Sequence, residues 1–432
     1  MVDNALGGRK PWRGLRAFGI VRAVTPPSAH ALVLESIHPS SHEVLAAAGV
    51  TVHAHAKAMA EEALIEALRA LPGRDKVVGI RSKTRITARV LEAVPELVAI
   101  GAFCIGTDQI DLKEARARGV AVFNAPFSST RSVAELVLGE IIMLARQIFP
   151  RAFACHRGEW DKSATGSHEV RGKTLGIVGY GHIGSQLSIL AEALGMQVIF
   201  HDIVTKLPLG NARPCASLDE LLDASDFVSL HVPDTPQTRG MIDAAAIARM
   251  VRGACLINAS RGQVVDVDAL RGAVDEGRLA GAAIDVYPKE PQGAGERFTS
   301  VLQGCERIIL TPHIGGSTEE AQASIGREVA TALGRYLELG VTPGSVTLPE
   351  LDAPPPQGCR LVNLHRNVPG VLSEIHRQIA ASDINITGEH LGTIESIGLL
   401  LMDMEVGRED PRAQALCQAI AAMPTSLRTR LL

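Results

Sequence analysis

The chain has 432 residues, a net charge of −4 and a hydrophobic content of 46%. This length exceeds one compact core, so two or three domains are expected, and the composition excludes a disordered chain. The acidic balance argues against nucleic-acid binding, and no apolar run reaches the roughly 18 residues that cross a membrane. The seven cysteines are widely spaced without a CxxC pair, which argues against a metal site and indicates a reducing cytoplasm.

The N-terminal part begins with a basic segment and then alternates between strand and helix patterns. Residues 1–28 lack an apolar stretch, so we expect a disordered extension rather than a secretory signal, with a transit peptide and a misplaced start codon as the alternatives. Strand-like runs separated by helical patterns then follow at 31–34, 50–53, 77–80, 97–101 and 120–123. This alternation indicates βαβ units around a parallel sheet.

The rest of the chain divides into a second α/β series and a different C-terminal pattern. A long helix is predicted over 132–146, a second α/β series over 174–310, and a further helix over 318–339. Proline then accumulates up to residue 357, a composition typical of linkers. Residues 358–432 follow a βαββαβ order. We therefore expect two Rossmann-like parallel-sheet units and a small C-terminal α/β unit.

A glycine-rich turn follows the first strand of the second series. Gly179, Gly181 and Gly184 form a GxGxxG pattern between an apolar strand and a helix. The three glycines permit a tight turn, the approach of a pyrophosphate and close packing of helix on strand. Asp202 ends the next strand, where a carboxylate binds the ribose hydroxyls and repels a 2′-phosphate. Since no arginine follows Asp202 immediately, the segment predicts NAD rather than NADP.

Three further segments place polar side chains at the ends of predicted strands. They contribute Arg261, Glu290 and His313, in that order. Ligands of doubly wound sheets lie outside the carboxyl ends of the strands, so we expect the three side chains to converge beside the nicotinamide. Imidazole suits proton transfer near neutral pH, a carboxylate can raise its pKa, and a guanidinium can bind a substrate carboxylate. Together they predict oxidation of a 2-hydroxy acid.

These motifs resemble the D-isomer-specific 2-hydroxyacid dehydrogenase family. The resemblance implies that Arg261, Glu290 and His313 are catalytic. It also implies a substrate-binding domain in two pieces, an NAD-binding Rossmann domain, a Pro-rich linker and a regulatory domain, which we expect at 29–128 with 316–345, 129–315, 346–357 and 358–432. The expected cofactor-binding residues are Gly179, Gly181, His182, Ile183, Gly184, Asp202, Ala259, Arg261, Asp285 and His313.

Other segments resemble the bacterial branch of this family that oxidises 3-phosphoglycerate, the entry step of serine biosynthesis. They are 79–84, 102–107, 124–127, 130–135, 157–160 and 206–211. Arg81 and Ser82, at a strand end, are then expected to bind the substrate's carboxylate or phosphate, together with Arg131 and Arg261. Some members of this branch also reduce 2-oxoglutarate. A glyoxylate, hydroxypyruvate or D-lactate dehydrogenase and a non-catalytic NAD-sensing scaffold are the alternatives.

The C-terminal unit resembles an ACT domain, a small ligand-sensing module, in its strand order and in the segment 362–372. The resemblance implies an allosteric enzyme with an L-serine site between two such domains, at His365, Asn367 and Asn385. Paired edge strands would then join the subunits into a homotetramer. Val368 stands where bacterial relatives carry a basic residue, so either Arg366 substitutes for it or the domain serves only in assembly.

Overall fold

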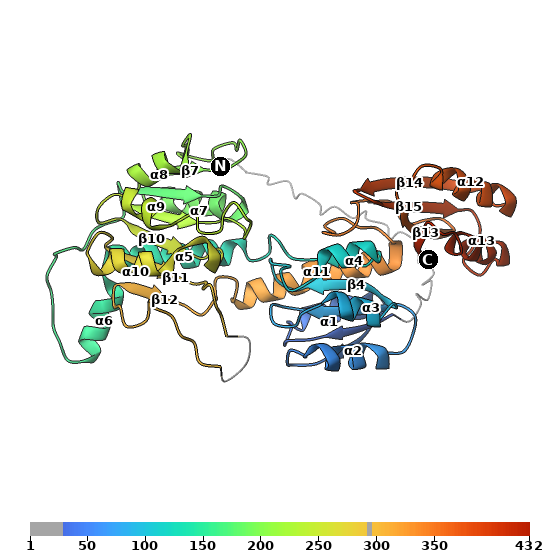
Figure 1. The fold of residues 1–432 in the computed structure, drawn as a ribbon, viewed down its shortest axis with the longest axis horizontal. Coiled ribbons are helices and arrows are strands. Elements are labelled where there is room, and N and C mark those ends of the chain that lie inside the picture. Colours follow the sequence, from blue (N-terminus) through green and yellow to red (C-terminus); the bar gives the residue numbers. More distant parts are fainter. Residues whose placement is uncertain (1–28, 292–295) are drawn as a thin grey trace, which may run out of the picture.

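The computed structural model describes residues 29–291 and 296–432, so the extension expected over 1–28 lies outside the described residues. Three β-sheets organise this part of the chain, two of them parallel and the third antiparallel (Figure 1). The predicted fold class, two parallel-sheet units and a C-terminal βαββαβ unit, is therefore confirmed. Within these two ranges, no helix is both long enough and apolar enough to cross a membrane.

The first sheet, at the centre of Figure 1, has five parallel strands between two helical layers. Its elements are β1 (His30–Val33), α1 (Ser40–Ala47), β2 (Thr51–Ala54), α2 (Glu61–Ala70), β3 (Lys76–Ile80), α3 (Ala88–Ala93), β4 (Leu97–Ala102), α4 (Leu112–Ala117), β5 (Ala121–Phe123) and the distant α11 (Glu319–Leu339). The strand order is β2-β1-β3-β4-β5. Strands β3 and β4 are buried along their whole length, because α1 and α11 cover one face and α2, α3 and α4 the other.

The second sheet has seven parallel strands and is also covered on both faces. Its elements are α5 (Thr130–Ala145), α6 (Ile148–His156), β6 (Thr174–Val178), α7 (His182–Ala193), β7 (Gln197–His201), β8 (Arg213–Pro214), α8 (Leu218–Ala224), β9 (Phe227–Leu230), α9 (Ala244–Arg249), β10 (Cys255–Asn258), the 3₁₀-helix η1 (Gly262–Val264), α10 (Val267–Asp275), β11 (Gly281–Ile284) and β12 (Ile308–Leu310). The strand order is β12-β11-β10-β9-β6-β7-β8. Helices α5 and α7 pack on one face, and α8, α9 and α10 on the other.

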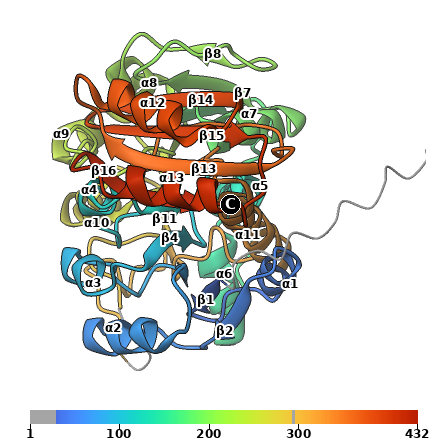
Figure 2. The ribbon, with the colours of Figure 1, turned by 90° about the vertical axis from the view of Figure 1, so that its right-hand side faces the viewer.

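The third sheet is antiparallel and belongs to the C-terminal unit. Its elements are β13 (Cys359–Arg366), α12 (Val371–Ser382), β14 (Ile386–Ile394), β15 (Ile397–Met404), α13 (Pro411–Ala421) and β16 (Ser426–Leu431). The strand order is β14-β15-β13-β16, with α12 and α13 on the outer face (Figure 2). The inner face joins the hydrophobic core of the first sheet, because side chains of β13 and β15 pack with those of α11.

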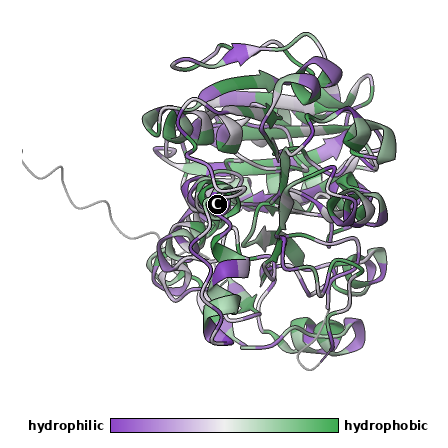
Figure 3. Ribbon diagram, turned by 90° about the vertical axis from the view of Figure 1, so that its left-hand side faces the viewer, coloured by the Kyte–Doolittle hydropathy of each residue, from purple (hydrophilic) through white to green (hydrophobic). Residues whose placement is uncertain are grey.

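The proline-rich segment before β13 packs along the first sheet and is not a detached linker. The amide of Val346 donates to the carbonyl of Val122 in β5, and the hydroxyl of Thr347 donates to the carbonyl of Val120. Leu348 and Ala353 are buried in the same core. Composition alone predicts a linker here, but these apolar and hydroxyl side chains tie the segment to the edge of the sheet. Figure 3 colours the ribbon by hydropathy: hydrophobic residues are frequent in the central strands, and many hydrophilic residues lie in the surrounding loops.

Two arginines of the C-terminal unit hold the last turn of α11. Arg360 is fully buried, donates two hydrogen bonds of 2.6 and 2.8 Å to the Asp403 carboxylate, and donates another to the carbonyl of Leu339. Arg430 donates to the carbonyls of Tyr336 and Leu337. The last carbonyls of a helix have no partner within it and carry the negative end of its dipole. The C-terminal unit is therefore docked on the helix that follows the His313 segment.

Candidate active site

The glycine fingerprint lies where the strand order of the second sheet reverses, between β6 and β9. Gly179 follows β6 with φ of +91°, a left-handed conformation that favours glycine. A β-carbon at Gly179 would lie 2.4 Å from the carbonyl oxygen of His231, which follows β9. A β-carbon at Gly184 would lie 2.3 Å from the carbonyl oxygen of Gly179. Close backbone approaches at this switch point therefore require both glycines.

Helix α7 presents its N-terminus to this turn. His182 and Ile183 form its first turn, and within the described chain no side chain caps it at Gly181. The first amide groups of a helix have no acceptor within it, and a β-carbon at Gly181 would meet no atom within 4 Å. A pyrophosphate fits this open position, because the free amides and the positive end of the helix dipole favour an anion.

Asp202 follows β7 and lies directly beside the glycine turn. Its two carboxylate oxygens accept hydrogen bonds from the amides of Tyr180, at 2.8 Å, and Val204, at 3.1 Å. These bonds hold the carboxylate in place and leave lone pairs for the ribose hydroxyls of a dinucleotide. A fixed negative charge at this position disfavours the 2′-phosphate of NADP.

His313 and Glu290 form a hydrogen-bonded pair at the ends of β12 and β11. Nδ1 of His313 lies 2.9 Å from Oε2 of Glu290, and the other oxygen of Glu290 accepts from the amide of Tyr287 at 3.1 Å. The hydrogen bond with Glu290 raises the pKa of His313, although partial burial opposes this effect. Burial alone would raise the pKa of Glu290, but the hydrogen bond and charge of His313 bring it below its usual range. The pair therefore leaves Nε2 of His313 available for proton transfer.

The backbone that carries His313 is fixed by Asp285. Asp285 is 1% exposed, and its oxygens accept from the hydroxyl of Thr311 at 2.7 Å and from the amides of Ile314 and Gly315 at 2.8 Å each. His313 itself has φ of +56°, which is uncommon for a residue other than glycine. Such a conformation persists only where its surroundings determine it, and Asp285 supplies that constraint. Direct contact of Asp285 with the cofactor stays a prediction.

Arg261 lies at the end of β10, in a turn that is shaped by Asn258. The side-chain amide of Asn258 donates to the carbonyl of Arg261, and its oxygen accepts from the amide and hydroxyl of Ser260. Nε of Arg261 lies 3.8 Å from a carboxylate oxygen of Asp108, which belongs to the loop after β4 in the first unit. The charge of Arg261 also acts on His313 and opposes the rise of its pKa. The guanidinium, the imidazole and the carboxylate of the predicted set are thus neighbours.

The first unit brings a second guanidinium to the same place. Arg81 follows β3, Ser82 comes next, and the charges of both Arg81 and Arg261 act on the thiol of Cys104. Burial nevertheless raises the pKa of Cys104 to about 11, so the thiol stays protonated. A β-carbon at Gly106 would lie 3.0 Å from Nη2 of Arg261. Arg81 from the first unit and Arg261 from the second therefore both lie near Cys104.

The three predicted substrate arginines differ in their partners. Nε of Arg131, in the first turn of α5, lies 2.5 Å from a carboxylate oxygen of Glu135, and both side chains are more than half exposed. Arg261 has Asp108 at 3.8 Å. The Arg81 guanidinium forms no hydrogen bond or salt bridge within residues 29–291 and 296–432. Arg81 is therefore the arginine of the three that is open to an anion from solution.

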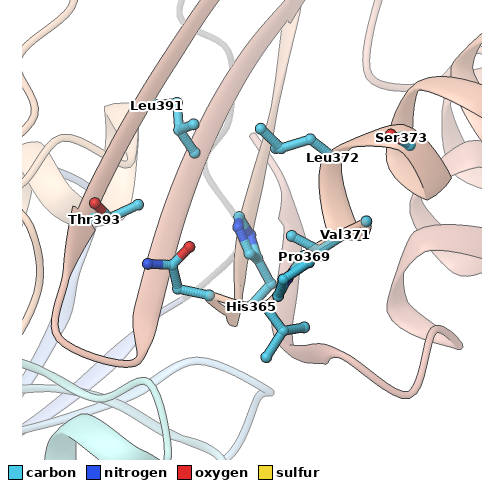
Figure 4. A pocket seen from close by; sticks show the side chains of 10 residues that line it. His365, Pro369, Val371, Leu372, Ser373, Leu391 and Thr393 are labelled. Atoms are coloured by element: carbon cyan, nitrogen blue, oxygen red, sulfur yellow. The ribbon is translucent and has the colours of Figure 1, made fainter.

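The predicted effector residues lie in two places of the C-terminal unit. His365 and Asn367 line a hollow of about 380 Å³ between the start of α12 and β14, together with Val368, Leu391 and others (Figure 4). His365 is buried, and its Nδ1 lies 3.0 Å from the side-chain oxygen of Asn363. Asn385 precedes β14, at the other end of that strand from Leu391, and binds Glu405. Asn385 is therefore not among the residues that line this hollow in the described chain.

Some residues that shape the site were absent from the sequence prediction. Asn258 and Thr311 position Arg261 and His313 through side-chain hydrogen bonds, and Asp108 approaches Arg261 from the other unit. A signal existed for Asn258, since an asparagine at a strand end before Ala-Ser-Arg-Gly is typical of a turn. No local pattern identified Asp108, because it lies 153 residues from Arg261 in the sequence.

Comparison with known proteins gives matches over most of the chain. Residues 138–315 match the family "D-isomer specific 2-hydroxyacid dehydrogenase, NAD binding domain", and residues 361–428 match "AHAS small subunit-like ACT domain". The D-3-phosphoglycerate dehydrogenase of Haemophilus influenzae is 51% identical, covering 88% of this chain and 92% of the relative. The enzyme of that name from Escherichia coli K12 is 49% identical, covering 93% of this chain and 97% of the relative.

A solved structure supports the same assignment for the first two units. The D-lactate dehydrogenase of Aquifex aeolicus, complexed with NAD and lactic acid, superposes with a TM-score of 0.64 at 26% identity, covering 74% of this chain and 100% of that one. The predicted cofactor, NAD, and the predicted class of enzyme, an NAD-dependent dehydrogenase, are thereby confirmed. The chain belongs to the D-isomer-specific 2-hydroxyacid dehydrogenases, within the family of the D-3-phosphoglycerate dehydrogenases.

Proposed function

We propose that this chain oxidises 3-phospho-D-glycerate to 3-phosphooxypyruvate with NAD, the first step of the phosphorylated route to L-serine. The observation that carries the proposal is the His313–Glu290 pair, 2.9 Å apart and next to Arg261. Arg81, on the other unit, has no salt bridge within the described parts of the chain. The names of the relatives at about half identity support the same substrate.

His313 is the proton acceptor of this reaction, and Arg261 holds the substrate. Nε2 of His313 removes the proton from the C2 hydroxyl, while Glu290 stabilises the imidazolium that forms. The Arg261 guanidinium binds the substrate carboxylate and, in the reverse direction, polarises the carbonyl. NAD, when it is bound, takes the hydride from C2. Arg81 and Ser82 bind a second anionic group of the substrate, and Arg131 adds positive charge.

Steady-state assays test the substrate directly. We expect NADH formation with 3-phosphoglycerate and, in the reverse direction, NADH consumption with 3-phosphooxypyruvate. D-Lactate, glyoxylate, hydroxypyruvate and 2-oxoglutarate are compared under the same conditions, because other branches of the family use the first three and some relatives reduce the last. A higher kcat/KM with D-lactate or glyoxylate would replace the proposed substrate. NADH binding without turnover of any of these acids would indicate a sensing scaffold instead.

The raised pKa of His313 predicts opposite pH dependences for the two directions. Oxidation requires the neutral imidazole, so its kcat/KM should rise as pH increases through this pKa. Reduction requires the imidazolium, so its kcat/KM should fall over the same range. Glu290→Gln removes the interaction that raises the pKa of His313. The pH profiles of oxidation and of reduction should therefore both move to lower pH. The matched control is Glu389→Gln, which alters the remote His376–Glu389 pair and should leave both profiles in place.

L-Serine is the proposed effector of the C-terminal unit. It would bind in the hollow at His365 and Asn367, with Asn385 of a second copy. The Pro369-Gly370 pair precedes α12, whose first amides can donate hydrogen bonds to a carboxylate. Val368 lines the hollow and offers no charge, so serine would depend on these amides and on Arg366. Adding L-serine should lower the rate of NADH formation with 3-phosphoglycerate. An unchanged rate would indicate that the C-terminal unit serves only in assembly.

A homotetramer in the cytoplasm completes the proposal. Strand β14 is an edge of the third sheet, and an unpaired edge is a template for another chain. On the arm formed by α6 and the segment after it, Phe153 is 48% and Trp160 is 81% exposed, as expected for side chains that another copy covers. All seven cysteines lie in the described part of the chain and are free thiols, which suits a reducing compartment.

A further inference from the structure

The loop after β3 carries Arg81 and Ser82, the residues to which the proposed function gives the second anion of the substrate. Seven residues, 81–87, lie between the end of β3 at Ile80 and the start of α3 at Ala88. A loop of this kind has no helical hydrogen bonds to hold it. Something else must therefore fix its backbone if the two side chains are to meet an anion in a defined position.

Glu35 holds this loop through two consecutive amides. One carboxylate oxygen accepts from the amide of Thr84 at 2.7 Å, and the other accepts from the amide of Lys83 at 3.1 Å. Glu35 follows β1, which pairs with β3 in the sheet, so the carboxylate approaches the loop from the neighbouring strand end. Hydrogen bonds from amides to a carboxylate are stronger than those to a neutral acceptor.

The environment of Glu35 sets it apart from an ordinary surface acid. It is 8% exposed, and its carboxylate has no salt-bridge partner among the residues that the structure describes. Its φ is +61° and that of Ser36 is +50°, two consecutive left-handed conformations without glycine. Glycine or asparagine would adopt this turn more readily, and strained backbone of this kind concentrates at functional sites. The strained turn is what directs the buried carboxylate to the loop.

The carbonyl side of the loop is held from another strand. The side-chain amide of Gln109, after β4, donates to the carbonyl of Arg81 at 2.5 Å, and the thiol of Cys104 lies 3.6 Å from the same oxygen. Glu35 therefore binds two amides of the loop backbone, and Gln109 binds one of its carbonyls. Among the described residues, no hydrogen bond or salt bridge engages the guanidinium of Arg81, the hydroxyl of Ser82 or the exposed ammonium group of Lys83.

We propose that Glu35 is a positioning residue for substrate recognition: its carboxylate binds the amides of Lys83 and Thr84 and thereby presents Arg81 and Ser82 to an anionic group of the substrate. The inference rests on the proposed function for the identity of that substrate. Glu35 does not touch the substrate itself. Its removal should therefore weaken substrate binding while the proton transfer at His313 continues.

Glu35→Gln is the principal test, with Glu35→Asp as the second variant. Glutamine offers one oxygen in place of two and turns an NH₂ group toward one of the loop amides, whereas aspartate is shorter and cannot span both. We expect the KM for 3-phosphoglycerate to rise about tenfold or more, with kcat and the KM for NAD within about threefold of wild type. A raised KM at constant kcat is the signature of lost binding that is shared by ground and transition states. Asp243→Asn, at the N-cap of α9, is the matched control and should change none of these constants.

A double-mutant cycle with Arg81→Met separates positioning from a general structural effect. If Glu35 acts through the loop, Glu35→Gln should add little to the loss caused by Arg81→Met alone. Additive losses, an unchanged KM in both Glu35 variants, or equal losses for NAD and substrate would each overturn the inference. A wild-type enzyme that is inactive with 3-phosphoglycerate would instead overturn the proposed function, so the two failures are distinguishable.

D-Glycerate, which lacks the phosphate, identifies the anion that the loop binds. A loss confined to 3-phosphoglycerate would support positioning toward the phosphate. An equal loss with D-glycerate would support positioning toward the carboxylate.

Thermal unfolding of each variant should match the wild type closely enough that the protein remains folded at the assay temperature.

Discussion

Replacing His313 with alanine is expected to lower kcat in both directions by about 10²–10⁴, the usual contribution of a general acid or base. The imidazole is hydrogen-bonded to Glu290 at 2.9 Å and is held by a loop that Asp285 fixes. Removing the ring leaves no group at this position to accept the C2 hydroxyl proton. The cofactor cradle at Gly179–Gly184 lies on other strands, so NADH affinity, measured by fluorescence titration, should change little.

The control for this substitution is a second histidine with the same kind of partner. His376 in α12 lies 3.1 Å from a carboxylate oxygen of Glu389, in the C-terminal unit. His376→Ala should leave kcat at the wild-type value. If His313→Ala retained full activity, or if both variants lost activity equally, the imidazole would have no part in the proton transfer.

Replacing Arg360 with methionine should destabilise the C-terminal unit by about 3–5 kcal/mol, the range for removing one partner of a buried ion pair. The substitution leaves the Asp403 carboxylate without its bidentate partner and removes the hydrogen bonds to the carbonyls of Leu339 and Pro354. Hydrogen exchange followed by mass spectrometry measures this loss locally. Faster exchange is expected in β13, β15 and the last turn of α11, with the second sheet unchanged.

Two comparisons sharpen the Arg360 experiment. Arg377→Ala breaks an exposed pair with Glu374 in α12 and should leave hydrogen exchange close to the wild-type rate, because solvent screens surface pairs. A double variant with Arg360→Met and Asp403→Leu removes both charges and should recover much of the loss. Unchanged exchange in Arg360→Met would mean that the pair does not hold the C-terminal unit to α11.

Local patterns were sufficient where structure follows from neighbouring residues. The predicted strand at 174–178 is β6, the predicted helix at 132–146 is α5 (Thr130–Ala145), and the final βαββαβ order is present. The hydrophobic period and the glycine spacing predict these elements, because side-chain alternation and backbone freedom act over a few residues. The proline-rich segment shows the limit, since composition predicted a linker and the side chains of Leu348 and Thr347 pack it against the sheet.

Local motifs were enough to identify the family, the glycine turn for NAD and the order in which arginine, glutamate and histidine occur along the chain. The groups that support them become visible in the folded chain: Asp285 binds the backbone after His313, Asp108 lies near Arg261, Glu35 binds the amide of Thr84, and Arg360 binds the end of α11. Each of these contacts joins different strand ends or units, and its geometry depends on how sheets and helices pack. The spacing of residues along the chain does not give the distances between them in space. These contacts can therefore be identified only in the folded structure.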